Sequence, residues 1–537
     1  MDVSPSAHID TFARDHQPVP ERLPDFVYPL PELHYPAALN CAAELLDGTI
    51  SRHGPDRTAL VGEGVTWTYG QLREQVARIA AVLTDDLGVV PGNRVLLRGP
   101  NSPWLAACWL AIISAGAVVV PVVPVLRGGE LRTIADIARV THALCDVRSL
   151  DDLVKAEIPG LGCTAFDGDG DGDGELQRLT AAREAAFAPV ATSADDICAI
   201  AFTSGTTGRP KGCMHTHRDM LATADTFSAH VLKPRPDDVF TGSPPLSFTY
   251  GLGGAVVFPL RAGASSVLLA RTTPDVLPTS IRRYGVTVLF TAPTAYRALL
   301  AQAEPQTLRT LRRCVSAGEK LPRAVWEDWY RACGVKIIDG IGSTEMLHIF
   351  IGSADDDIRP GATGLPVPGY EARVVDDDDN EVPDGEPGHL AVRGPTGCRY
   401  LDDPRQAEYV RHGWNHTGDT YIRDADGYFW YQARSDDMII SSGYNIAGPE
   451  VEEALMRHPE VVEVAVVGVP DEARGQLVSA FVVLRDPAGA SEEKKRELQD
   501  FAKAEIAPYK YPRAVQFLEA LPRTPTGKLQ RYRLRPE

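Results

Sequence analysis

One glycine-rich stretch, residues 201–215, has the residue types that bind a polyphosphate. It reads AFTSGTTGRPKGCMH and overlaps an apolar run, ICAIAF, that predicts a buried strand. Glycines let backbone N–H groups approach phosphate oxygens, hydroxyl groups donate hydrogen bonds, and a lysine supplies positive charge. The candidate phosphate ligands are Thr203, Ser204, Gly205, Thr206, Thr207, Gly208 and Lys211. The stretch is not a Walker A loop, because Gly212 instead of Ser or Thr follows Lys211.

The composition describes a large, acidic, globular protein. The chain has 537 residues, which predicts about three to five structural units at roughly 100–200 residues per domain. Apolar residues make up 44% of the chain, enough for a large core. The formal net charge is −18, so bulk charge disfavours binding to nucleic acid or to an anionic membrane. We therefore expect neither of these partners.

Cysteine usage points to a reducing compartment. Nine cysteines are scattered between Cys41 and Cys398, and none forms a CxxC pair. An odd number at irregular spacing disfavours a disulfide framework and a zinc finger. The first residues, MDVSPSAHIDTFARDH, have neither the basic nor the apolar region of a signal peptide. We therefore expect a cytoplasmic protein.

An uncharged stretch between Trp104 and Leu126 is long enough to span a membrane. It contains one glycine and two prolines, which do not suit a continuous helix. We interpret it as a buried helix over residues 104–114, a glycine turn and a buried strand over residues 117–123. The sequence therefore predicts no membrane span here.

Two acidic runs raise the question of a calcium site. The run DGDGDGDGE starts at Asp167, but Arg178 or Thr180 stands where the twelfth position of an EF-hand loop needs glutamate. Alternating glycines suit a flexible loop instead. The second run, Asp376 to Asp379, precedes an asparagine and a proline, which is typical of a solvated turn.

Alternating apolar runs and amphipathic stretches from about residue 60 onward predict parallel sheets covered by helices. After residue 435 the pattern changes to an amphipathic helix, two strands and a charged helix, EEKKRELQDFAKAEI, which together form a compact α+β unit. The sequence therefore predicts an α/β fold with a large N-terminal domain, residues 1–435, and a small C-terminal domain, residues 436–537.

Five motifs resemble those of one enzyme family. TSGTTGRPKG resembles the phosphate loop of the adenylate-forming superfamily of acyl-CoA synthetases, peptide-synthetase adenylation domains and luciferases. The other four, in the order of the family, are GSTE (342–345), TGD (417–419), ARSDDMI (433–439) and PRTPTGKLQR (522–531). The chain is identified as a member of this superfamily over about residues 40–535. The resemblance implies stacked mixed sheets and helices in the large domain and a mobile small domain.

The resemblance also implies an ATP site and a role for each of its residues. Thr344 would contact the α-phosphate, and Glu345 would bind the Mg²⁺ that neutralises the phosphates. Lys528 would reach the acid and the α-phosphate and would stabilise charge as pyrophosphate leaves. The remaining implied ligands are Thr206, Thr207 and Lys211 at the β- and γ-phosphates, Gly318, Glu319 and Lys320 at the adenine, Asp339 and Gly340 in the same nucleotide site, and Asp419 and Arg434 at the ribose.

Two residues depart from the family pattern. Ala433 stands where the family usually has Gly, and Ile341 stands where many members have a tyrosine that stacks on adenine. An aliphatic side chain can still cover the base, so the implied use of ATP stands.

The reaction that the resemblance implies has two steps. A carboxylate and ATP give an acyl-adenylate and pyrophosphate, and a thiol then attacks the adenylate. Asp436 matches the hinge of the family, and Ser442 and Gly443 would line the tunnel of the thiol. The motifs do not choose between coenzyme A and the phosphopantetheine arm of a carrier protein, although a free-standing ligase that uses coenzyme A is the simpler interpretation. A homodimer is expected only from the habit of the family.

The stretches DGIGSTEMLHIF and PLSFTYGLGG resemble the benzoate-CoA ligase branch of the family rather than the fatty-acyl branch. By this resemblance Thr249, Tyr250, Gly342, His348 and Ile349 would contact the aryl ring and its carboxylate. A flat aromatic acid would suit this combination of an aromatic side chain, a glycine, an aliphatic side chain and one imidazole. From spacing alone, His348 could instead be a core histidine.

Thr249 is the most informative departure, because benzoate ligases have alanine there. A buried hydroxyl left unpaired by benzoate would cost about 1–3 kcal/mol, and a polar ring substituent would satisfy it. The whole chain most resembles 2-aminobenzoate (anthranilate)-CoA ligases. We therefore expect an ATP-dependent aryl-acid:CoA ligase for 2-aminobenzoate or a hydroxylated relative such as 3-hydroxyanthranilate, with salicylate and benzoate as alternatives. An enzyme that loads an aryl acid onto a carrier protein and a non-catalytic nucleotide-binding relative are the competing interpretations.

Overall fold

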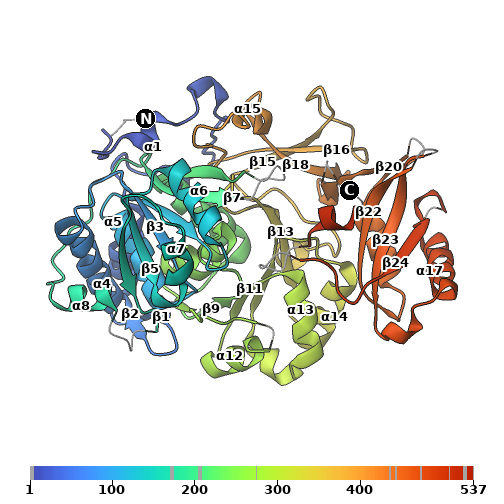
Figure 1. Cartoon of the computed structure of the whole chain (residues 1–537), viewed down its shortest axis with the longest axis horizontal. Coiled ribbons are helices and arrows are strands. Elements are labelled where there is room, and N and C mark those ends of the chain that lie inside the picture. Colours follow the sequence, from blue (N-terminus) through green and yellow to red (C-terminus); the bar gives the residue numbers. More distant parts are fainter. Residues whose placement is uncertain are drawn as a thin grey trace.

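A computed structural model describes most of the chain (Figure 1). The described residues are 5–169, 174–203, 209–273, 275–434, 437–441, 444–471, 474–506, 508–523 and 529–535. Within these ranges the strands form four sheets, and helices pack on them. The predicted α/β class is confirmed, because a large body of sheets and helices precedes a small C-terminal unit, drawn in orange and red in Figure 1.

The N-terminal part of the chain forms the first of two large, mostly parallel sheets. Its described strands have the order β6-β5-β3-β4-β7-β8. They are β3 (Arg94–Arg98), β4 (Val118–Val122), β5 (His142–Asp146), β6 (Gly162–Phe166), β7 (Ile197–Thr203) and β8 (Lys211–Thr216). Neighbouring strands are parallel except for β7 and β8, which form an antiparallel hairpin. β4 is buried along its whole length, as expected for a parallel strand covered on both faces.

The second large sheet lies beside the first and has the order β14-β13-β12-β11-β9-β10-β1-β2 in the described residues. Its strands are β1 (Thr58–Val61), β2 (Thr66–Thr68), β9 (Val239–Gly242), β10 (Ser265–Val267), β11 (Val288–Thr291), β12 (Arg313–Ser316), β13 (Ile337–Gly342) and β14 (Ile349–Gly352). The strands from β1 to β13 in this order are parallel, and β2 and β14 pair antiparallel at the two edges. Parallel pairing brings the loops that follow β9, β11, β12 and β13 to one edge of the sheet.

A third, antiparallel sheet was not predicted from the sequence. It has the order β15-β16-β18-β17, and β19 pairs with β18. Its strands are β15 (Glu371–Val375), β16 (Pro387–Arg393), β17 (Val410–Arg411), β18 (Trp414–Arg423) and β19 (Phe429–Arg434). In Figure 1 this sheet lies above β13 and next to the C-terminal unit.

The C-terminal unit matches the predicted succession of elements. The amphipathic helix is α16 (Gly448–Met456), the two strands are β22 (Val461–Asp471) and β23 (Gly475–Leu484), and the charged helix is α17 (Glu492–Glu505). Three short strands, β20 (Ile439–Ser441), β21 (Tyr444–Ile446) and β24 (Ala514–Phe517), complete a sheet of order β21-β20-β23-β22 in which β24 adds to β23.

Helices cover both large sheets, and local sequence signals start several of them. The longer ones are α4 (Tyr69–Ala81), α5 (Pro103–Ser114), α6 (Gly128–Ala138), α9 (His217–Thr223), α12 (Leu277–Tyr284), α13 (Pro293–Gln302) and α14 (Arg323–Cys333). Thr68 and Gln71 form a capping box at α4. At α5 the Ser102 hydroxyl accepts from the backbone N–H of Leu105, and a proline occupies the first turn.

The uncharged stretch that resembled a membrane span is a helix and a strand, as predicted. Both α5 and β4 are buried at every residue. The helix is apolar on all sides because protein surrounds it on all sides. In the part of the chain that the structure describes, no helix is long and apolar enough to cross a membrane.

The second acidic run forms the predicted turn. One carboxylate oxygen of Asp376 accepts from the backbone N–H groups of Asp378 and Asn380, an arrangement typical of Asx turns. Residues 170–173 of the first acidic run lie outside the described ranges, so the flexible loop expected there stays a prediction.

Candidate functional site

The strands that flank the glycine-rich stretch form a hairpin. β7 ends at Thr203 and β8 begins at Lys211, and these two residues are paired across the hairpin. The predicted phosphate ligands between them, Ser204, Gly205, Thr206, Thr207 and Gly208, lie outside the described residues. The hairpin places Lys211 at the carboxyl end of β7, the side of a parallel sheet on which ligands bind.

Lys211 and Glu345 come together through a third side chain, Tyr400. Lys211 Nζ donates to the Tyr400 hydroxyl at 2.6 Å, and that hydroxyl donates to Oε1 of Glu345 at 2.6 Å. Lys211 Nζ lies 3.6 Å from the same carboxylate oxygen. One tyrosine therefore holds the predicted phosphate lysine beside the predicted Mg²⁺ ligand.

Backbone pairing fixes the position of Tyr400. Its segment forms a bridge to Cys213 of β8, and its N–H donates to Oε1 of Gln406 at 2.9 Å. Burial, and then the negative charge of Glu345, raises the pKa of Tyr400. The phenol therefore stays protonated at neutral pH and can donate to the carboxylate. Sequence analysis missed Tyr400 because no motif marks it and it lies far from Lys211 in the chain.

Thr344 and Glu345 lie in the turn between β13 and β14. The Ser343 hydroxyl accepts from Met346 N at 3.2 Å, and the Thr344 carbonyl accepts from Leu347 N at 3.2 Å. Glu345 is 7% exposed, so its carboxylate faces the interior of the site. Proteins usually bind Mg²⁺ through one or two carboxylates together with substrate phosphates. A buried carboxylate next to Lys211 therefore fits the predicted Mg²⁺ ligand.

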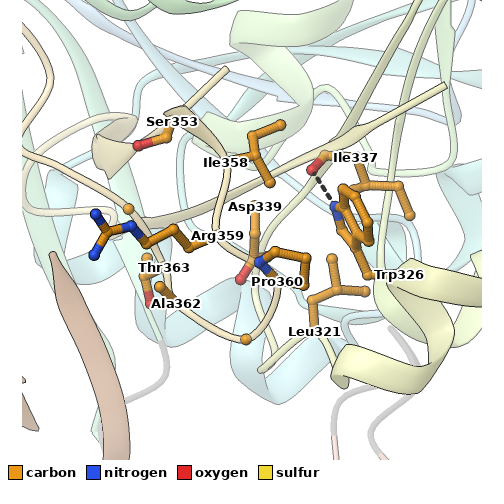
Figure 2. Close-up of a pocket in the computed structure, with 12 residues that line it drawn as sticks. Leu321, Trp326, Ile337, Asp339, Ser353, Ile358, Arg359, Pro360, Ala362 and Thr363 are labelled. Atoms are coloured by element: carbon orange, nitrogen blue, oxygen red, sulfur yellow. Dashed lines mark hydrogen bonds between the residues drawn. The ribbon is translucent and has the colours of Figure 1, made fainter. Parts of the chain in front are cut away.

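A pocket lies beside the predicted nucleotide residues (Figure 2). Leu321 and Trp326 supply apolar walls, and Asp339 and Thr363 supply polar groups. The Trp326 indole donates to the Ile337 carbonyl at 2.9 Å, which fixes the orientation of the ring. Apolar walls with a few polar groups are typical of ligand-binding pockets. The residues of this pocket other than Asp339 were not identified from the sequence, because they follow no motif.

The hydrogen-bonding groups of the Asp339 carboxyl match those of a purine base. Its Oδ1 makes no hydrogen bond to any described residue. Burial raises the pKa of Asp339 to about 8, so at neutral pH most molecules carry a protonated carboxyl that both donates and accepts. An adenine edge, with an amino donor next to a ring-nitrogen acceptor, matches this pair of functions. The chemistry of Asp339 therefore fits the implied nucleotide.

Asp419 and Arg434 face each other on β18 and β19. Arg434 Nη1 donates to Asp419 Oδ1 at 3.3 Å. Burial, and then the charge of Asp419, raises the pKa of Tyr421, whose hydroxyl lies 3.2 Å from that of Thr363 in the pocket wall. The pair therefore lies near Tyr421, whose hydroxyl reaches the pocket wall at Thr363, and its contact with a ribose stays a prediction.

The loop from Gly318 to Lys320 contacts the C-terminal unit. Lys320 Nζ donates to Oε2 of Glu453 on α16 at 2.9 Å, and Arg523 Nη1 donates to Oε1 of Glu319 at 3.5 Å. In this arrangement both side chains of the loop are directed at the small domain. Contact of this loop with adenine stays a prediction.

Tyr250 and His348 come together in an aromatic cluster. The His348 ring centroid lies 4.5 Å from that of Phe258, 5.3 Å from Phe227 and 5.7 Å from Tyr250. Burial lowers the pKa of His348 to about 3, so its imidazole is neutral. Neither ring nitrogen makes a hydrogen bond of normal geometry to a described residue, although the imidazole lies beside the backbone of Tyr250. Core histidines are normally hydrogen-bonded, so this observation favours the predicted contact with a bound acid.

Gly340 and Gly342 allow β14 to lie close to β13. A Cβ atom on Gly340 would lie 2.7 Å from Cγ2 of Ile349, and one on Gly342 would lie 2.7 Å from the backbone of His348. Such distances are too short for any residue other than glycine at either position. The two glycines therefore set the positions of His348 and Ile349.

Thr249 belongs to a neighbouring part of the site. It begins α10 (Thr249–Leu252) and lines a cavity between this helix and the hairpin of β7 and β8. The next residue, Tyr250, donates its hydroxyl to the Val315 carbonyl at 2.9 Å and packs in the aromatic cluster. The predicted aryl contacts are therefore divided between the aromatic cluster and this cavity.

Four more predicted functional residues lie outside the described ranges. They are the hinge Asp436, the tunnel residues Ser442 and Gly443, and the catalytic Lys528. Their roles stay predictions.

Comparison with known proteins finds relatives over nearly the whole chain. A family model described as AMP-binding enzyme matches residues 48–399, and one described as AMP-binding enzyme C-terminal domain matches residues 450–528. A benzoate–CoA ligase of Thauera aromatica is 35% identical over 513 residues, which cover 94% of this chain and 97% of that protein. A 3-hydroxybenzoate–CoA ligase of Aromatoleum sp. (strain CIB) is 33% identical, with 93% and 97% covered.

A solved structure shares the fold. The crystal structure of the anthranilate CoA ligase AuaEII in complex with anthranoyl-AMP superposes with a TM-score of 0.87 at 34% sequence identity. The superposition covers 93% of this chain and 97% of that one, so both the large body and the C-terminal unit are included.

Proposed function

The chain belongs to the adenylate-forming family of AMP-binding enzymes, and we propose that it activates 2-aminobenzoate or a hydroxylated relative and transfers the aryl group to coenzyme A. It is an AMP-forming aryl-acid:CoA ligase that uses ATP, Mg²⁺ and coenzyme A. The identity of the acid within the aryl class is what we propose. The aryl assignment is carried by the buried imidazole of His348 among aromatic rings, and the choice of a ring with a polar substituent rests on Thr249 at the neighbouring cavity.

The reaction divides into two displacements. A carboxylate oxygen of the acid attacks the α-phosphorus of ATP, and the bond to the bridging oxygen of pyrophosphate breaks. The thiol of coenzyme A then loses its proton and attacks the carbonyl carbon of the adenylate, and AMP leaves. A bound Mg²⁺ supplies neutralisation of the phosphate charge.

Each described side chain has a defined task in the first step. Glu345 would hold Mg²⁺ through a carboxylate that Tyr400 orients, and Lys211 would contact the β- and γ-phosphates. Asp339 would pair with the adenine edge, and Asp419 would accept hydrogen bonds from the ribose hydroxyls. These groups approach from β8, β13 and β18 and so fix the nucleotide against three sheets.

For the second step, we infer that the small domain rotates about Asp436, which also sets the proposed domain boundary. Any such rotation must break the contacts of Lys320 with Glu453 and of Glu319 with Arg523. Both are partly exposed ion pairs, each worth about 0–1 kcal/mol, so they can hold one orientation without preventing the other.

We also infer a cytoplasmic location. All nine cysteines are free thiols, and seven of them are buried. Buried thiols that are not paired suit a reducing compartment.

Product analysis tests the proposed function. The protein is incubated with ATP, Mg²⁺, coenzyme A and an equimolar pool of aryl and fatty acids, and the products are identified by mass spectrometry. A dominant aminobenzoyl- or hydroxyaminobenzoyl-CoA product is expected. An adenylate without thioester would identify a carrier protein as the acceptor, and a dominant fatty acyl-CoA would overturn the aryl assignment.

Thr249→Ala is expected to shift substrate preference toward benzoate. The hydroxyl of Thr249 has a partner when the ring carries a polar substituent and is left unpaired by benzoate, a difference of about 1–3 kcal/mol when buried. The ratio of kcat/KM for 2-aminobenzoate to that for benzoate should therefore fall by at least about fivefold. An unchanged ratio would show that Thr249 does not determine which acid the enzyme prefers.

A further inference from the structure

The cavity beside Thr249 is enclosed by elements from both large sheets. Its lining includes Trp109 of α5, Ala199 of β7, His215 of β8, Thr249 of α10 and Leu347. Leu347 directly precedes His348 of the aromatic cluster, and Thr249 directly precedes Tyr250. The cavity therefore lies next to the residues that were predicted to contact the aryl ring.

Two side chains in this cavity have polar atoms without a hydrogen bond of normal geometry. Trp109 is 2% exposed and His215 is 0% exposed. The indole Nε1 of Trp109 makes no hydrogen bond to any described residue. Neither ring nitrogen of His215 makes a hydrogen bond of normal geometry, although the imidazole lies beside the backbone of Thr344. Buried polar groups nearly always have partners, so the indole N–H of Trp109 and the imidazole of His215 at one cavity indicate a ligand or a water molecule.

The protonation state of His215 decides which hydrogen bonds its ring nitrogens can make. Burial lowers the pKa of His215 to about 4, so at neutral pH the imidazole has one N–H donor and one acceptor nitrogen. Trp109 adds a second donor. A group that both accepts and donates would satisfy Trp109 and His215 together, which describes a hydroxyl or an amino group.

The size of the cavity restricts its occupant. The cavity has room for about one water molecule. A whole aryl ring does not fit in this space, but a single hydroxyl or amino group does.

We propose that this cavity is the subsite for a hydroxyl or amino substituent of the aryl acid. Trp109 and His215, which line the cavity together with Thr249, would recognise this substituent. This inference rests on the proposed function, since the ring must lie against the residues predicted to contact it, among them Tyr250 and His348. A substituent on the ring edge that faces Thr249 then enters the cavity. An unsubstituted ring leaves both polar side chains unpaired, so the subsite selects against benzoate.

Two conservative variants test the subsite. Trp109→Phe removes the indole N–H and keeps an aromatic ring, and His215→Gln keeps a polar side chain but moves its donor and acceptor. Trp329→Phe is the matched control, because Trp329 is also fully buried with an unpartnered Nε1 and packs on Tyr296 away from this cavity. For each protein, kcat/KM is measured with benzoate, 2-aminobenzoate and the hydroxybenzoates.

In the wild type we expect the substituted acids to be preferred. Each cavity variant should lower the ratio of kcat/KM for the preferred substituted acid to that for benzoate by about tenfold, and Trp329→Phe should leave the ratio unchanged. A fall that is equal for all acids would mean that the cavity holds only a water molecule and would overturn the subsite. If the wild type forms no aryl-CoA from any acid, the proposed function fails instead.

Discussion

Replacing Lys528 with alanine is expected to lower the rate of adenylation by about 10²–10³-fold and to spare the thioester step. The proposed task of this lysine is to stabilise the charge that develops as pyrophosphate leaves, and that charge is absent when coenzyme A attacks a finished adenylate. Adenylation is measured by pyrophosphate release from ATP and the aryl acid. The second step is measured by thioester formation from supplied aryl-adenylate and coenzyme A.

The residues on either side of Lys528 support this assignment. Arg523 and Leu529 form an antiparallel bridge, and Arg523 also contacts Glu319 in the loop that was predicted to line the adenine. Residues 523 and 529 therefore lie next to each other, and Arg523 contacts the loop that was predicted to line the adenine. Lys510→Ala is the matched control, because Lys510 lies in the same domain with its Nζ held by Glu450 at 2.6 Å. Normal adenylation by Lys528→Ala, or equal loss of both steps, would refute the role.

Much of the fold follows from local sequence. The helix and strand of the uncharged stretch were predicted within one residue at each end, because burial on all sides leaves a continuous apolar run. The helices of the C-terminal unit were predicted from a different signal, since α16 and α17 each have one apolar face. The third sheet was missed because its strands carry many polar residues and its pairs follow no simple alternation, as the polar run from Asn415 to Asp419 in β18 shows.

The residues of the candidate site also differ in whether local sequence identifies them. Motif residues such as Lys211 and Glu345 were identified because each belongs to a short, contiguous pattern. Tyr400 was not, because it meets Lys211 only through a bridge between β8 and a segment 189 residues away. Trp109 and His215 were missed for a related reason. In the sequence each resembles an ordinary core residue, and only the packed structure shows that both line one cavity.

Tyr400→Phe is expected to reduce adenylation about 10–100-fold and to raise the Mg²⁺ concentration needed for half-maximal rate, because hydrogen bonds to charged groups contribute about 1.5–3 kcal/mol. The hydroxyl accepts from Lys211 and donates to Glu345, so it orients both charges before ATP arrives. Without it, the lysine and the carboxylate, already 3.6 Å apart, can pair directly and compete with phosphate and metal. Pyrophosphate release is measured against ATP and against Mg²⁺.

Tyr370→Phe separates this positioning role from loss of a buried phenol. Tyr370 is also buried, and its hydroxyl lies 2.9 Å from Thr396 Oγ1, with no charged group in that hydrogen bond. Both variants should lose a similar amount of thermal stability, but only Tyr400→Phe should change the Mg²⁺ requirement. Thioester formation from supplied adenylate, which needs neither phosphate lysine nor metal, should stay near the wild-type rate in both. If Tyr400→Phe keeps the wild-type Mg²⁺ dependence, Lys211 and Glu345 are positioned by the backbone alone.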